Sequence, residues 1–262
     1  MARTKIMLVG SQPSFRAMVR QVLSQDTDLE ATELFECDQG EDSNNAIAEI
    51  EANSPDIVLL DIGHHIFNEL KLGNKISRTF PKTGVVILST NPEEDDNELF
   101  EVAKSGAVAY LRSKQPVGAE LIKEIKRSSN GERPINDRVI NNPKVAWLIL
   151  RQLQEMALRA GTSEAVAFPP NLEELQVLQL IAKGNQKKQI ASILGVSERT
   201  IIERISSILF KLNSSERAYD SLNQMRDGLL SIRLARDGNL FILNNMRSPC
   251  QLYPLLNSPR HT

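Results

Sequence analysis

Polar residues stand where predicted strands end in the first half of this 262-residue chain. They are Gly10-Ser11, Asp61, Ser89-Thr90 and Lys114. The carboxyl ends of parallel strands meet at one edge of a sheet, and such sheets bind ligands at that edge. We find no nucleophile–base pair and no complete set of metal ligands in the sequence, so we expect neither an enzyme nor a bound cofactor.

Basic residues mark a second candidate surface, near residues 186–212. Two short helical patterns lie on either side of Gly195, with Ala191 four residues before it, and this spacing predicts a helix-turn-helix. The second helix of that motif enters the major groove of DNA. Residues at the start of the first of these helices suit contacts with phosphates. The predicted DNA contacts are Lys187, Lys188, Arg199, Thr200, Glu203, Arg204 and Ser206.

The residues of the first candidate site, at the strand ends, lie in a part of the chain where predicted strands and helices alternate. Apolar runs at 5–9, 57–60 and 85–88 predict buried strands, and weaker patterns at 29–37 and 107–111 predict two more. Residues with helical periodicity lie between and after these runs. Five strands interleaved with five helices predict a doubly wound, flavodoxin-like α/β domain with a five-stranded parallel sheet.

The order of these motifs resembles the receiver domain of two-component response regulators. Leu59-Leu60-Asp61 is similar to the phosphoacceptor strand, and Ile87-Leu88-Ser89 to the strand that ends in the signalling hydroxyl. The segment 106–111 is similar to the strand with the switch aromatic residue, here Tyr110. The resemblance implies Asp61 as the candidate phosphoacceptor and Ser89, Tyr110 and Lys114 as the switch residues.

The sequence departs from that family at the end of the first strand. Gly10 and Ser11 replace the usual acidic pair, so Asp61 has no companion carboxylates there for Mg²⁺. Phosphoryl transfer depends on such charge neutralisation, so we expect Mg²⁺ binding and phosphorylation to be weak or absent. The family's lysine falls on Ser113 in an ungapped alignment and on Lys114 after a one-residue insertion, and the two alternatives remain open.

The second half resembles the LuxR/NarL/FixJ type of helix-turn-helix, an all-α DNA-binding domain. The segments 175–178, 182–184, 190–194 and 196–201 all fit that pattern. The family often has a basic residue where Ile202 lies, and Glu203 is acidic, which leaves the target sequence open. The resemblance implies double-stranded DNA as a partner and a homodimer.

Composition and charge divide the chain in two. Residues 1–114 hold 11 Lys and Arg against 19 Asp and Glu, and residues 115–262 hold 20 against 14. An acidic half joined to a mildly basic half indicates a regulatory part and a nucleic-acid-binding part. No stretch reaches the roughly 20 apolar residues of a membrane span. With only Cys37 and Cys250, and no apolar signal core at the start, we expect a cytoplasmic protein without a membrane partner.

Four regions follow. We predict a degenerate receiver-like domain at 1–127, a linker with a helix at 128–167, a helix-turn-helix domain at 168–228 and an extension with a possible hairpin at 229–262.

Three functions fit these observations. The first is a transcription regulator whose receiver responds to a ligand or protein partner and not to Mg²⁺-dependent phosphorylation. The second is a conventional regulator that a sensor histidine kinase phosphorylates at Asp61. The third, from another class, is a protein-interaction adaptor that has lost DNA binding.

Overall fold

The structure is a computed structural model, and it describes residues 3–10, 13–35, 43–62, 66–89, 91, 95–112, 118–160 and 170–214. Several expected features lie outside these residues: Ser11, Thr90, Ser113, Lys114 and the hairpin at 229–262. No helix of the described residues is long and apolar enough to cross a membrane.

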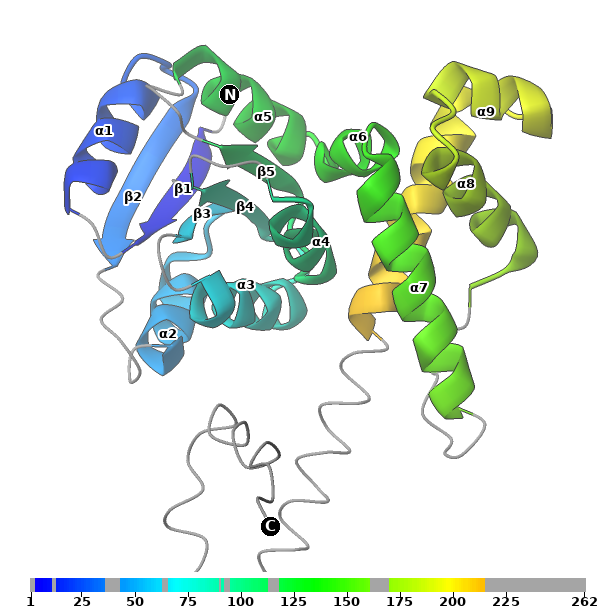
Figure 1. The fold of residues 1–262 in the computed structure, drawn as a ribbon. Helices are drawn as coiled ribbons and strands as arrows, with labels where there is room; N and C mark the ends of the chain where they lie inside the picture. The colour runs from blue at the N-terminus through cyan, green and yellow to red at the C-terminus, as the bar shows by residue number, and fades with distance from the viewer. Residues whose placement is uncertain are drawn as a thin grey trace, which may run out of the picture. The chain divides into compact units, whose positions relative to one another are not determined.

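The first half consists of alternating strands and helices (Figure 1). The strands are β1 (Thr4–Val9), β2 (Leu29–Phe35), β3 (Ile57–Ile62), β4 (Gly84–Ser89) and β5 (Ala109–Arg112). The helices are α1 (Pro13–Leu23), α2 (Ser43–Asn53), α3 (Ile66–Thr79), α4 (Asp96–Lys104) and α5 (Gly118–Ser129). All paired strands are parallel and the order is β2-β1-β3-β4-β5, which confirms the predicted doubly wound sheet.

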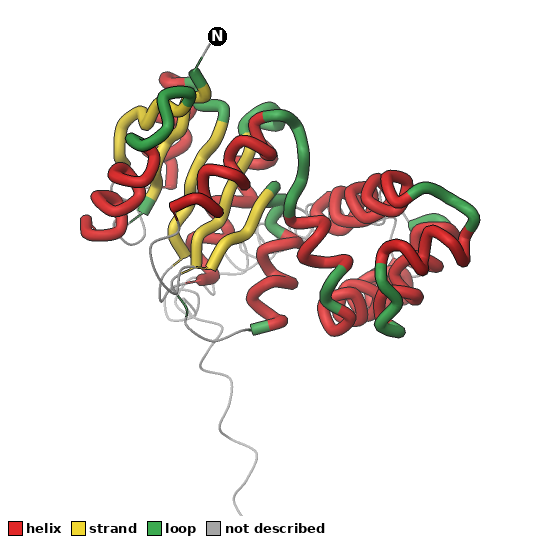
Figure 2. The backbone as a smooth tube through the Cα atoms, turned by 90° about the horizontal axis from the view of Figure 1, so that it is seen from above, coloured by secondary structure: helices red, strands yellow, loops and turns green. Residues whose placement is uncertain are grey.

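Buried side chains cover both faces of the sheet, with helices on both sides in Figure 2. On one face, Ile6, Leu8 and Leu59 pack with α1 and α5. On the other, alternate residues such as Met7 and Val58 pack with α2, α3 and α4. Because successive side chains of a strand point to opposite faces, a continuous apolar run is what a doubly covered strand requires.

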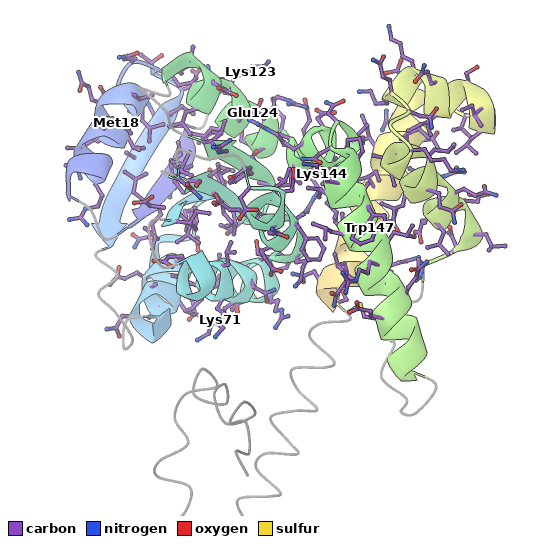
Figure 3. The ribbon with its side chains drawn as sticks, in the orientation of Figure 1. Met18, Lys71, Lys123, Glu124, Lys144 and Trp147 are labelled. Carbon is purple, nitrogen blue, oxygen red and sulfur yellow. The ribbon has the colours of Figure 1, made fainter. Side chains whose placement is uncertain are left out.

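The second half is helical. It contains α6 (Ile135–Ile140), α7 (Pro143–Ala160), α8 (Leu172–Ala182), α9 (Lys187–Leu194) and a further helix over 198–214, the gold helix of Figure 1. Lys144 and Trp147 lie on α7, near its start (Figure 3). The Lys144 ammonium is 3.2 Å from the Asp96 carboxylate of α4, and the Arg151 guanidinium lies over the Trp147 ring.

Helix α6 precedes α7 within the segment 128–167, which the sequence analysis predicts to be a linker with a helix. Its apolar residues Ile135 and Val139 are fully buried, which explains why it folds despite the surrounding Ser, Asn and Gly. The Ile135 N–H donates to the Val108 carbonyl, and Arg133 donates to the carbonyls of Gly106 and Ala107. These contacts fix α6 to the segment that leads into β5.

Candidate functional site

Helix α9 and the 198–214 helix are joined by a tight turn. Gly195 has φ 66°, the left-handed conformation that glycine adopts without steric cost, and it ends α9. Ser197 then caps the next helix, because its Oγ accepts a hydrogen bond from the Thr200 N–H at 3.0 Å. The two helices therefore have the connection that the Gly195 and Ser197 positions predict.

The first helix of this domain is fixed by a buried carboxylate. Asn171 and Glu174 form a capping box at the start of α8. Glu174, only 3% exposed, also accepts hydrogen bonds from Lys211 and Ser207 of the 198–214 helix. Burial by itself would raise the pKa of Glu174, but these donors and the Asn171 N–H lower it below its usual range. This cluster positions α8 against the helix that carries the predicted base contacts.

The predicted DNA-contacting residues fall into two groups. Arg199 and Lys188 are exposed, with Arg199 at 87%, and Arg199 Nε donates to Glu203 Oε1 at 2.9 Å. Arg204 instead contacts α8, since its Nη2 donates to Glu173 Oε2 at 2.6 Å and its side chain is 17% exposed.

Two more of the predicted DNA-contacting residues, Thr200 and Ser206, also contact other side chains of the protein. Thr200 is half-buried, and its hydroxyl lies 2.8 Å from that of Ser197. Ser206 Oγ accepts a hydrogen bond from Asn136 Nδ2 of α6 at 2.6 Å.

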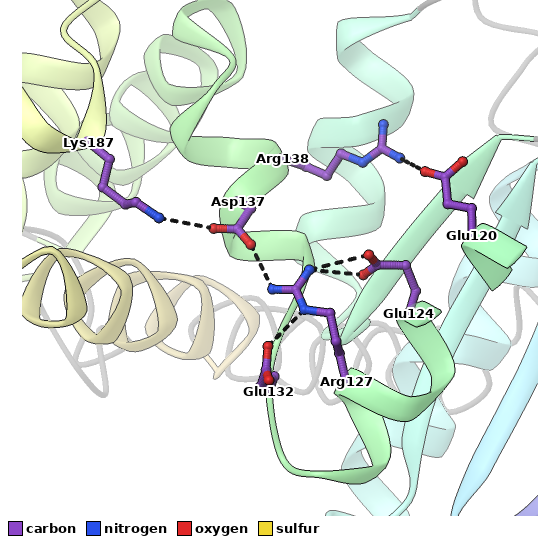
Figure 4. A network of polar contacts seen from close by, with 7 residues as sticks. All are labelled: Glu120, Glu124, Arg127, Glu132, Asp137, Arg138 and Lys187. Carbon is purple, nitrogen blue, oxygen red and sulfur yellow. Dashed lines mark hydrogen bonds and ion pairs between the residues drawn. The ribbon is translucent and has the colours of Figure 1, made fainter. Parts of the chain in front are cut away.

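Lys187 belongs to an ion network built around α6 (Figure 4). Its ammonium lies 3.7 Å from Asp137 and 3.7 Å from Glu198. Asp137 also pairs with Arg127 at 2.8 Å, and Arg127 contacts Glu124 and Glu132. Hydrogen bonding by Asp137 is the main reason that the pKa of Arg127 lies above its usual range.

At the receiver edge, Asp61 is the second-last residue of β3 and is 4% exposed. Its Oδ1 has no hydrogen-bond partner among the described residues. Burial, and then the charge of Glu69, raise the pKa of Asp61 to about 6. At the end of β1, the Gly10 carbonyl accepts a hydrogen bond from Arg16 at 2.7 Å. A guanidinium donor therefore lies beside the position of the usual acidic pair.

The switch positions Ser89 and Tyr110 lie in a buried polar cluster. The Tyr110 hydroxyl donates to Glu98 Oε1 at 2.6 Å, and burial followed by this carboxylate raises the pKa of Tyr110 above its usual range. Asn91 Nδ2 donates to the other oxygen of Glu98 at 3.0 Å, and the Asn91 N–H donates to Ser89 Oγ at 3.2 Å. The sequence analysis missed Glu98 and Asn91, because the only signal for them in the sequence is that they lie close to the acidic residues 93–96.

A cavity of about 610 Å³ lies beside Tyr110, between α4, β5, α5 and α6. Its carboxylates include Asp95, Asp96 and Glu120, and its arginines are Arg112, Arg127 and Arg138. Among the residues that the structure describes, no group of three or more His, Cys, Asp or Glu side chains could hold a metal ion.

Comparisons with known proteins agree with this architecture. Residues 173–219 match the family described as bacterial regulatory proteins, luxR family. The chain is similar to the transcriptional regulatory protein DegU of Brevibacillus brevis, with 25% identity over 236 residues, 88% of this chain and 97% of DegU. It is also similar to the uncharacterized transcriptional regulatory protein YxjL of Bacillus subtilis, with 28% identity over 228 residues, 87% of this chain and 98% of YxjL.

Among solved structures, the RcsB response regulator of Salmonella typhimurium is similar at 20% identity, with a TM-score of 0.43. The similarity covers 81% of this chain and 93% of that chain.

The class that follows from the helix-turn-helix and the named relatives is a DNA-binding transcription regulator. More closely, residues 173–219 match the LuxR-type helix-turn-helix, and the chain is similar over most of its length to regulators that include the response regulator VraR, which confirms the resemblance found in the sequence.

Proposed function

We propose that this regulator binds duplex DNA through the exposed side of the 198–214 helix, without control by Mg²⁺-dependent phosphorylation of Asp61. The observation that carries the second part is the environment of Asp61. Its pKa of about 6 reflects burial and a neighbouring acid, and Gly10 supplies no carboxylate from β1. Burial, the larger cause, disfavours the ionised carboxylate, and without the carboxylates that usually follow the first strand Mg²⁺ would have few ligands.

The state of the switch residues supports the same proposal. Tyr110 is 4% exposed and hydrogen-bonded to Glu98, and Ser89 is fully buried. The hydroxyls of both residues are therefore hydrogen-bonded by protein groups, Tyr110 to Glu98 and Ser89 to the Asn91 N–H. The signal that changes them would then be a ligand or protein partner at the receiver, as the sequence analysis expects.

For DNA binding, we propose Arg199 as the main base contact and Lys188 and Lys187 as phosphate contacts. Arg199 is 87% exposed near the start of the helix, which is where recognition helices reach base edges. We further propose that the protein binds as a homodimer, whose geometry sets the spacing of the two half-sites. Thr200, Arg204 and Ser206 remain proposed contacts, although Arg204 must first leave Glu173 and Ser206 must leave Asn136. Glu203 belongs to the same surface through its hydrogen bond with Arg199.

The receiver part of the proposal is tested with a small phosphodonor. The full chain is incubated with acetyl phosphate and Mg²⁺, and intact-mass spectrometry follows phosphorylation, with Asp61→Asn as the control. We expect little or no phosphorylated protein. Rapid, stoichiometric modification that Asp61→Asn abolishes would favour the conventional kinase-driven regulator.

The DNA part is tested by gel shift against promoter fragments over a range of salt concentrations. Phosphate contacts make binding weaken steeply as salt rises, and a specific complex should persist at moderate salt. No specific complex at moderate salt would favour the adaptor, which the exposure of Arg199 and Lys188 otherwise argues against.

A further inference from the structure

We infer that Glu203 is a positioning residue that holds the Arg199 guanidinium toward a guanine, and that it does not itself contact a base. The inference rests on the proposed DNA-binding function. Arg199 Nε donates to Glu203 Oε1 at 2.9 Å, one helical turn away. The side chains are 87% and 60% exposed, so this contact orients an otherwise unconstrained arginine on the outer side of the helix.

The pair uses only one edge of the guanidinium. Its contact runs through Nε, and no described residue bonds Nη1 or Nη2. Those two groups form a planar fork that matches the O6 and N7 acceptors of guanine in the major groove. Fixing Nε therefore leaves available the part of Arg199 that distinguishes guanine from the other bases.

Helix stability does not account for this pair. Acidic residues stabilise a helix near its N-terminus, and an acid–base pair is more favourable when the acid comes first. Arg199 is the second residue of the 198–214 helix and precedes Glu203, so both preferences are reversed. Exposed ion pairs also contribute little to folding. A role in positioning explains an arrangement that the helix itself does not favour.

Glu203 also limits where Arg199 can bind. A mobile arginine would readily contact a phosphate, which carries no sequence information. A carboxylate beside the guanidinium is repelled by phosphates, and so favours the arrangement in which Arg199 points at a base edge. The competing role, in which Glu203 accepts a hydrogen bond from the amino group of cytosine, would specify a base pair of its own.

The test is selection of binding sites from a random duplex pool, followed by titrations of the selected site and its single-base variants. The proteins are the full-length wild type, Arg199→Ala, Glu203→Ala, Glu203→Gln and the double alanine variant. For Arg199→Ala we expect discrimination at one G·C pair to fall about tenfold or more. For Glu203→Ala we expect a smaller loss at the same pair, and for Glu203→Gln a smaller loss still, because an amide oxygen still accepts from Nε.

The double variant separates positioning from direct contact. Positioning predicts that Glu203→Ala changes nothing further once Arg199 is absent. Loss of discrimination at a different base pair, additive losses in the double variant, or unchanged discrimination in Glu203→Ala would each overturn the inference. Failure of the wild type to select any sequence would overturn the proposed function, and the inference with it.

Glu155→Ala is the control, because Glu155 forms a pair of the same spacing and 2.9 Å distance with Arg151 on α7, although this pair is less exposed. We expect its site preference to equal that of the wild type. If Glu155→Ala lowered discrimination at the G·C pair as much as Glu203→Ala does, the loss would be a general effect of charge, and the positioning role of Glu203 would be refuted.

Discussion

At the scale of single residues, Asp61 has the position of the candidate phosphoacceptor, but its surroundings favour the protonated carboxyl group. It is the second-last residue of a buried strand, and another acid, Glu69, is close enough to raise its pKa. A carboxyl group whose pKa is raised in the folded chain stabilises the fold while it is protonated. That stability is lost as the pH rises from the ordinary value near 4 through the folded value of about 6.

We therefore predict that Asp61→Asn makes the protein more stable than the wild type at pH 8, by on the order of 2 kcal/mol. The difference should shrink as the pH falls below about 5. Urea unfolding at both pH values measures it, with Glu51→Gln on the exposed side of α2 as the control. Equal or lower stability of Asp61→Asn at pH 8 would refute this account of the site.

Tyr110 and Glu98 give a second prediction at this scale. Removing the hydroxyl in Tyr110→Phe takes a donor from a buried carboxylate, which should cost about 1.5–3 kcal/mol. The same change in a Glu98→Ala background should cost much less, because the partner is already gone. Chemical unfolding of the two single variants and the double variant measures this coupling, and strictly additive costs would contradict it.

At the scale of elements, α6 connects the sheet domain to the helix-turn-helix. It is anchored through Arg133, Ile135 and Arg127, and it contacts Ser206 and Lys187 through Asn136 and Asp137. The carboxylate of Asp137 thus competes with DNA phosphates for the Lys187 ammonium.

We predict that Asp137→Asn binds DNA more tightly than the wild type at low salt, because Lys187 no longer has to leave Asp137 to contact a phosphate. The gain should be only about two- to fivefold, because an exposed ion pair of this kind is weak. Fluorescence anisotropy with a labelled duplex measures the affinity. Glu132→Gln is the control, since Glu132 pairs with the same arginine at the same 2.8 Å distance. Equal affinities for the two variants would show that Asp137 does not restrain Lys187.

The elements also show which parts of the structure a sequence can predict. Strands β1, β3 and β4 were the most predictable, because a strand buried on both faces needs an apolar run, as Ile57–Leu60 is. The Asn171 capping box and the Gly195 turn were predictable because local chemistry determines them. Helix α6 was not, since it has only six residues and is held by contacts distant in the sequence, such as that of the Ile135 N–H with the Val108 carbonyl.

The candidate site was predictable in part, for a related reason. The residue types at 199 and 203 are visible in the sequence, but the sequence does not show that Arg204 pairs with Glu173 or that Ser206 faces Asn136. Those contacts join residues 31 and 70 positions apart. Glu98 was missed because its partner Tyr110 lies on a different element, β5.

At the scale of the whole molecule, an acidic first half and a mildly basic second half share one chain. The acidic part repels DNA, so binding must come from local basic groups such as Arg199 and Lys188. We expect a salt dependence that reflects a few phosphate contacts per subunit. This arrangement suits a regulator whose first half controls the second without contacting DNA.

The most direct test is an anisotropy titration of one selected duplex with the wild type, Asp61→Asn and Arg199→Ala. Each is measured with and without acetyl phosphate and Mg²⁺. We predict that the wild type and Asp61→Asn bind with Kd values within about twofold under both conditions, and that Arg199→Ala binds at least about tenfold more weakly. A phosphodonor that tightens wild-type binding tenfold but not that of Asp61→Asn, or an Arg199→Ala variant with undiminished affinity, would contradict the account.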